Sequence, residues 1–174
     1  MNFNKFLIIK IFFILINCQL LFNPIKANAA QEIKIIYSIF SRTIKVNSLK
    51  DFAEEGVSTK KLRRILKATG STDQEIRSVL NKDFEVPITI ASKLIYSEIG
   101  NVFLTRLSSI LHPPFANDER TGMLALRASV IQGLKIGNGK INIVNFFEGY
   151  PTKTIILDVN ALSKVMNKVE SISE

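Results

Sequence analysis

The chain has 174 residues and a mass of 19.6 kDa, with 47% apolar and 22% charged residues. At about 100–200 residues per domain, this length excludes a large two-domain enzyme, and the apolar content excludes a disordered or collagen-like chain. Twenty-three Lys and Arg against fifteen Asp and Glu give a net charge of +8, which suggests an anionic partner such as nucleic acid or lipid.

The first 29 residues have the order of a signal peptide. Basic residues precede an apolar run at 11–16, and the segment ends with Ala27 and Ala29, the small residues that signal peptidase requires. A retained membrane anchor is the alternative, but a span needs about 20 largely apolar residues, and Lys10 and the polar residues 17–19 interrupt this one. We predict cleavage after Ala29 and export to the periplasm, the thylakoid lumen or the exterior.

Export changes the composition of the mature chain, residues 30–174. The leader holds three lysines and no acidic residue, so 20 basic residues remain against 15 acidic ones and the mature charge is +5. The only cysteine, Cys18, also leaves, so the mature chain can form no disulfide and no thiolate metal site. A lipoprotein role for Cys18 is disfavoured because Asn17 precedes it where that processing prefers a small residue.

The mature chain is expected to form one α+β domain, predominantly α-helical, over a small antiparallel sheet. Two β-rich runs, 32–37 and 42–46, suit a hairpin through the link 38–41, and 154–159 has the composition of a strand that joins this hairpin. In such a sheet, residues 32 and 158 lie near each other.

Start signals divide the remaining chain into about seven to eight short helices. The expected first residues or N-caps are Asn47 or Ser48, Ser58, Thr72 with Glu75 as a capping box, Pro87, Ser97, Asn117 or Asp118, and Asn160. The helix from about Glu119 to Lys135 is the most apolar and is rich in small residues, so we expect it to be the central, most buried helix.

Catalytic signatures are weak. The chain lacks the Gly-x-Ser-x-Gly pentapeptide of α/β hydrolases. His112, the only histidine, would have to be the base of any serine triad, and two prolines follow it in an expected loop, which favours a surface or packing role. Ser58 and Lys61 have the Ser-x-x-Lys spacing of an acylating serine and its lysine, but helix capping explains Ser58 better. The segment 137–140 begins like a phosphate-binding loop but lacks the other positions of that motif. We expect no cofactor and no metal.

Four basic residues lie within about 100° of arc on one predicted helix, opposite its apolar residues. They are Lys60, Arg63, Arg64 and Lys67. This basic surface patch could dock weakly on an anionic membrane surface or an acidic partner, although a solvated face is the simpler interpretation. Nucleic acid is not expected, because an exported +5 domain without an aromatic-basic motif has little to recommend it as a binder.

Arg127 lies in the apolar segment 123–131, where a buried guanidinium is costly without a carboxylate or several carbonyl partners. We predict a structural ion pair, with a clamp on a ligand carboxylate as the alternative.

Several segments resemble one known module. They are the 46–56 region after the hairpin, LIYSEIG at 94–100, TGMLALRA at 121–128, and FF at 146–147 running to YPTKTI at 150–155. Together they resemble a cyanobacterial domain of unknown function catalogued with alpha/beta hydrolases, over nearly all of residues 32–160. In longer relatives a similar module precedes a hydrolase domain that carries its own nucleophile, and this chain resembles the module alone.

The resemblance implies the hydrolase label without its chemistry. No nucleophile, base or oxyanion residue can be carried over, since the matching positions are Gly100, Gly122, Arg127 and Pro151. We therefore expect a non-catalytic exported module that binds a protein partner or accompanies a separately encoded hydrolase. The alternatives are a serine esterase or lipase-like hydrolase in its own right, and a protein that binds a lipid surface or an apolar ligand.

Overall fold

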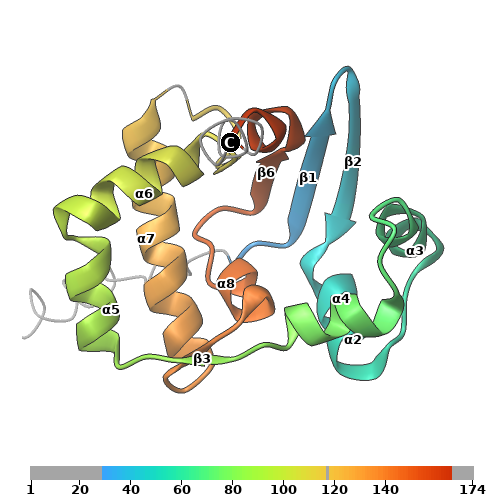
Figure 1. The fold of residues 1–174 in the computed structure, drawn as a ribbon, viewed down its shortest axis with the longest axis horizontal. Coiled ribbons are helices and arrows are strands. Elements are labelled where there is room, and N and C mark those ends of the chain that lie inside the picture. The colour runs from blue at the N-terminus through green and yellow to red at the C-terminus, as the bar shows by residue number, and fades with distance from the viewer. Residues whose placement is uncertain (1–28, 117, 166–174) are drawn as a thin grey trace, which may run out of the picture.

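The computed structural model describes residues 29–116 and 118–165 (Figure 1). The predicted leader up to residue 28, Asn117, and the end of the last predicted helix lie outside the described residues. Among the residues that are described, no helix is long and apolar enough to cross a membrane.

A four-stranded sheet has the order β2-β1-β6-β4. Its strands are β1 (Glu32–Tyr37), β2 (Phe40–Lys45), β4 (Leu111–His112) and β6 (Thr154–Asp158). The predicted hairpin is confirmed, with a turn of only Ser38 and Ile39 between β1 and β2. The predicted C-terminal strand also joins it, next to β1.

The pairing of β1 with β6 is parallel, where an antiparallel sheet was expected, while the other two pairings are antiparallel. Glu32 pairs with Thr154 and Ile36 pairs with Asp158. Residues 32 and 158 therefore lie on neighbouring strands but at opposite ends of the pair, which corrects the expected proximity. A parallel pair needs a long crossover, and here the helices between residues 46 and 153 supply it.

Helices make up most of the remaining chain, as predicted. They are α2 (Val46–Glu55), α3 (Lys60–Lys67), α4 (Asp73–Leu80), α5 (Ile88–Ile95), α6 (Glu98–Ser108), α7 (Glu119–Ile136), α8 (Ile143–Glu148) and a helix at 159–165. Two short strands, β3 (Phe84–Glu85) and β5 (Lys140–Ile141), pair antiparallel outside the main sheet. No local pattern predicts these two-residue strands.

The helix starts divide into confirmed and corrected predictions. The Thr72 capping box, the Ser97 cap and the Asp118 cap are confirmed.

Three other helices begin at residues that differ from the predicted ones. The α2 helix follows β2 directly, with Lys45 as N-cap, because no loop separates the two elements. Thr59 rather than Ser58 caps α3, since its side chain accepts from the Leu62 amide. The Asp158 carboxylate, not Asn160, accepts the amides at the start of the last helix.

Helix α7 is the central helix, as its small residues predict. Gly122, Ala125, Ser129 and Gly133 are all buried. A Cβ at Gly149 would lie 2.5 Å from the Gly133 nitrogen, so α7 and α8 approach closely there. Figure 1 shows α7 between the sheet on one side and the α5–α6 pair on the other.

Candidate functional site

Arg127 of α7 holds the corner between α5 and α6. Its side chain is buried, with the residue 9% exposed. The Nε atom donates to the Ile95 carbonyl at 3.0 Å, and Nη2 donates to the Asn101 side-chain oxygen. The guanidinium carbon lies 4.5 Å from the centre of the Tyr96 ring, a cation–π distance.

These contacts correct the predicted ion pair. Within residues 29–116 and 118–165, no carboxylate lies at salt-bridge distance from Arg127, and the ion pair that is present joins Lys50 to Glu148 at 2.9 Å. Carbonyl and amide oxygens instead satisfy the buried guanidinium. Because both partners belong to the α5–α6 corner, Arg127 positions that corner on α7.

Two glycines let the three helices approach each other at this corner. A Cβ at Gly100 would lie 2.0 Å from the Leu94 carbonyl oxygen, so only glycine permits the tight turn from α5 into α6. A Cβ at Gly122 would lie 2.7 Å from the Ser108 Cβ, where α6 crosses α7. The corner is therefore fixed by backbone proximity as well as by Arg127.

Several apolar side chains of this corner are exposed. We call the α5–α6 face the set of apolar side chains between 39% and 80% exposed on these two helices and their turn: Ile88, Ile90, Leu94, Tyr96, Ile99, Val102 and Phe103. A cavity of about 480 Å³ lies along α6 and is lined by apolar residues together with Glu98 and Arg106. The helical periodicity of these residues predicted the helices correctly, but not that the apolar side would face outward.

His112 lies in β4, paired with Ile156, rather than in the expected loop, because residues 111–112 extend along the edge of β6. It is half-buried and lines a cavity of about 220 Å³. The other lining residues include Ser108, Ser109, Asp118 and Glu119, so the residue types of a serine triad do gather here.

The hydrogen bonds around that cavity serve local structure. Ser108 and Ser109 donate their hydroxyls to the carbonyls three residues earlier on α6. Asp118 accepts from the Thr121 amide at 2.6 Å as the α7 cap, and this bond lowers the pKa of its carboxyl group. The His112 Nδ1 atom lies 2.9 Å from the Pro113 carbonyl, which leaves Nε2 as the ring atom available for a base.

The other predicted motifs have simpler explanations. Ser58 accepts from the Arg63 Nε atom at 3.1 Å, and no hydrogen bond joins it to Lys61 in the described structure. Residues 137–139 form a turn between α7 and β5, with Asn138 and Gly139 at positive φ. No group of three or more His, Cys, Asp or Glu side chains suited to a metal is found among the described residues.

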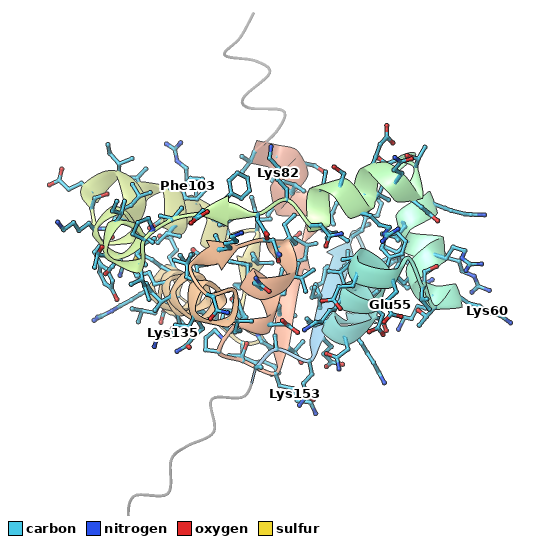
Figure 2. The ribbon with its side chains drawn as sticks, turned by 90° about the horizontal axis from the view of Figure 1, so that it is seen from below. Glu55, Lys60, Lys82, Phe103, Lys135 and Lys153 are labelled. Atoms are coloured by element: carbon cyan, nitrogen blue, oxygen red, sulfur yellow. The ribbon has the colours of Figure 1, made fainter. Side chains whose placement is uncertain are left out.

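Two residues of the predicted basic patch, Lys60 and Arg64, line a groove that the sequence did not predict, whereas Arg63 and Lys67 do not. Lys60, Arg63, Arg64 and Lys67 are all exposed. Figure 2 shows Lys60 and Phe103 well separated along the long axis of the molecule. A cavity of about 630 Å³ lies between α3 and β2, and its lining residues are Ser41, Arg42, Thr43, Lys60, Lys61, Arg64 and Ile65.

Tyr150 is the one fully buried polar group left without a partner in the described structure. The residue is 0% exposed, its ring packs edge-on against Phe146, and its hydroxyl has no hydrogen-bond partner there. Burial raises the pKa of this hydroxyl above its usual range, so it stays protonated.

Residues 29–158 match the protein family DUF1400, described as alpha/beta hydrolase of unknown function. The chain belongs to this family. No curated protein and no solved structure matches it. The matched region begins just before β1 and ends at the last residue of β6, so the DUF1400 unit coincides with the sheet and its helical crossover. The segments 94–100 and 121–128, which carry the resemblance, build the α5–α6–α7 corner.

Proposed function

We propose that this DUF1400 protein is a non-catalytic exported module that binds a separately encoded, exported α/β hydrolase through the α5–α6 face. The observation that carries the proposal is the number of exposed apolar side chains on these helices, three of which, Ile99, Val102 and Phe103, line one cavity along α6. Single exposed apolar side chains are ordinary, whereas large contiguous patches mark interaction sites.

The most exposed members of the face lie together on α6. Ile99 is 80% exposed and Phe103 is 63% exposed. Glu98 and Arg106 line the same cavity and provide a polar border of both signs. An apolar centre with a charged rim is the usual anatomy of a protein–protein interface.

The face is held in a fixed geometry before any partner arrives. Arg127 anchors both α5 and α6, and Gly100 permits their close turn. A preorganised surface loses less conformational entropy on binding, which increases affinity for a given buried area.

The non-catalytic part of the proposal is supported by the hydrogen bonds around His112. Both neighbouring serine hydroxyls donate to helix carbonyls, and Asp118 is engaged as a helix cap. The family description supplies the class of partner, since a module labelled with hydrolases but lacking their nucleophile motif suits an accessory role.

Site-specific photo-crosslinking in the native host tests this proposal. A photoreactive phenylalanine analogue replaces Phe103, and the adduct is identified by mass spectrometry. Phe115 is the matched control, because it is 96% exposed but lies outside the face. We expect an exported α/β hydrolase crosslinked from position 103, absent from position 115 and lost with Ile99→Asp. Adducts that do not distinguish the two positions would contradict the proposal.

A hydrolase acting at the His112 cavity is the second candidate function. The gathering of Ser108, Ser109, His112 and Asp118 around one cavity favours it. Ser109 is the exposed serine of the two and His112 Nε2 would be its base. A fluorophosphonate probe decides between the two functions: stoichiometric labelling lost in Ser109→Ala and in His112→Gln would establish the hydrolase and reject the non-catalytic module.

A further inference from the structure

The groove between β2 and α3 follows the free edge of the sheet. The β2 strand is terminal in the sheet order, and no described strand pairs with its outer side. Successive residues of a strand point to opposite faces, yet three consecutive residues, Ser41, Arg42 and Thr43, all line the groove. The groove therefore runs along the strand edge rather than over one face.

The hairpin register determines which backbone groups face this groove. With a two-residue turn, Tyr37 and Phe40 form the hydrogen-bonded closing pair, and such pairs alternate along an antiparallel ladder. Arg42, opposite Ile35, is therefore also hydrogen-bonded to β1, whereas the amides and carbonyls of Ser41 and Thr43 point outward. The Ser41 carbonyl accepts from Arg42 Nη1 at 3.3 Å, as expected for a group that does not bond β1.

The opposite wall of the groove is strongly basic. Lys60, Lys61 and Arg64 of α3 line it, together with Arg42 of β2, and no carboxylate is among the lining residues. Ile65, also of α3, adds an apolar contact point. The first turn of α3 contains no acidic residue, so the lysines there add to the positive end of the helix dipole rather than offset it.

We propose that an extended acidic peptide segment of another protein binds in this groove by adding a strand to the edge of β2. Its main chain pairs with the outward amides and carbonyls of Ser41 and Thr43, and its carboxylates contact the basic residues of α3. Strand addition uses main-chain hydrogen bonds for affinity and side-chain pockets for specificity. This surface is distinct from the α5–α6 face and does not depend on the function proposed for it.

A peptide fits the groove better than a lipid headgroup or free phosphate. An anion needs only the cations, whereas the unpaired strand edge offers alternating donors and acceptors that match the main chain of another extended segment. This difference gives a test that separates the partners, because a change in the β2 amide should affect a peptide and leave a phosphate group unaffected.

The experiment selects ligands from a displayed library of randomised ten-residue peptides, using the purified exported protein. We expect enrichment of peptides with several Asp or Glu residues and measure their affinity by fluorescence anisotropy. Thr43→Pro removes the outward amide without breaking a β1 hydrogen bond. It should weaken binding at least about tenfold, as should Lys61→Glu with Arg64→Glu, each loss corresponding to about 1.4 kcal/mol.

Matched controls keep the test independent of folding. Thr43→Ala retains the amide and should bind like the wild type, and Lys67→Glu changes a charge of α3 outside the groove. Hydrogen exchange should slow at Ser41 and Thr43 when peptide binds. Failure to enrich acidic peptides, or equal binding by Thr43→Pro and wild type, would overturn the proposal. Binding to phosphatidylglycerol vesicles that is lost in Arg64→Glu but unchanged in Thr43→Pro would overturn it in favour of lipid.

Discussion

The two ends of the molecule expose different chemistry on differently built supports. At one end, α5 and α6 present apolar side chains outward while a buried arginine and a backbone-tight glycine fix their turn. At the other end, α3 and the edge of β2 leave a groove whose lining includes Arg42, Lys60, Lys61 and Arg64. Figure 1 shows the α5–α6 pair and α3 at opposite ends of the molecule, with α7, α8 and the sheet between them.

The two surfaces have different structural requirements. An apolar docking face gains affinity from shape, so its helices must hold one geometry. A strand edge already carries its recognition groups in the backbone, so the neighbouring helix needs only to place charge beside it. Substitutions should accordingly lower the free energy of unfolding strongly at the α5–α6 corner and only slightly around α3.

The largest expected effect is at Gly100. In Gly100→Ala the new Cβ would meet the Leu94 carbonyl at 2.0 Å, and such overpacking should lower the free energy of unfolding by about 3 kcal/mol. Gly70→Ala is the comparison at the other end, because Gly70 has a φ of +73° but nothing within 4 Å of its Cβ position. The free energy of unfolding of Gly70→Ala should fall by only about 1 kcal/mol. Urea denaturation measures both, and equal losses would remove the contrast between the ends.

Arg127→Met should lower the free energy of unfolding by about 2 kcal/mol, since it leaves the Ile95 carbonyl and the Asn101 side chain without their donor. Arg64→Met, on the exposed surface of α3, should change it by less than about 0.5 kcal/mol. If Arg127→Met is as mild as Arg64→Met, the guanidinium does not hold the α5–α6 corner.

Tyr150→Phe tests the stability of the buried core between the two ends of the molecule. Removing a buried hydroxyl that lacks a partner in the described structure should raise the free energy of unfolding by about 1 kcal/mol. Thermal or urea unfolding measures the change. A destabilised variant would show instead that the hydroxyl makes a hydrogen bond in solution.

The smallest effect concerns the Lys50–Glu148 ion pair, which joins α2 to α8. Its hydrogen bond with Glu148 raises the pKa of Lys50. The pair therefore stabilises the fold below the unfolded lysine pKa of about 10.4, and this contribution is lost as pH rises through the higher folded value. Because more than a third of the Lys50 side chain is exposed, Lys50→Met should cost under about 1 kcal/mol. Unfolding at pH 8 and pH 11 should show this difference shrinking, and a constant difference would contradict it.

Local signals predicted much of the fold. The Thr72–Glu75 capping box formed as expected because both partners lie within one helical turn. Gly56 ends α2 with a φ of +77°, and the small residues of α7 are buried against neighbouring helices. Each of these features depends on residues close in sequence.

Long-range features could not be predicted in the same way. The parallel β1–β6 pairing depends on the path of more than a hundred intervening residues. The partners of Arg127 come from Ile95 and Asn101, about 30 residues earlier. The apolar periodicity at Leu94 and Phe103 is the same for a buried and an exposed face, so only the packing shows that this face is open.

We propose that the α5–α6 face binds a hydrolase partner. Isothermal titration of the crosslinked partner against wild type, Phe103→Asp and Phe115→Asp tests it most directly. Placing a carboxylate in an apolar contact should weaken binding by at least about a hundredfold for Phe103→Asp, equivalent to roughly 2.8 kcal/mol. Phe115→Asp should bind like the wild type. Equal affinities for all three proteins would contradict the account.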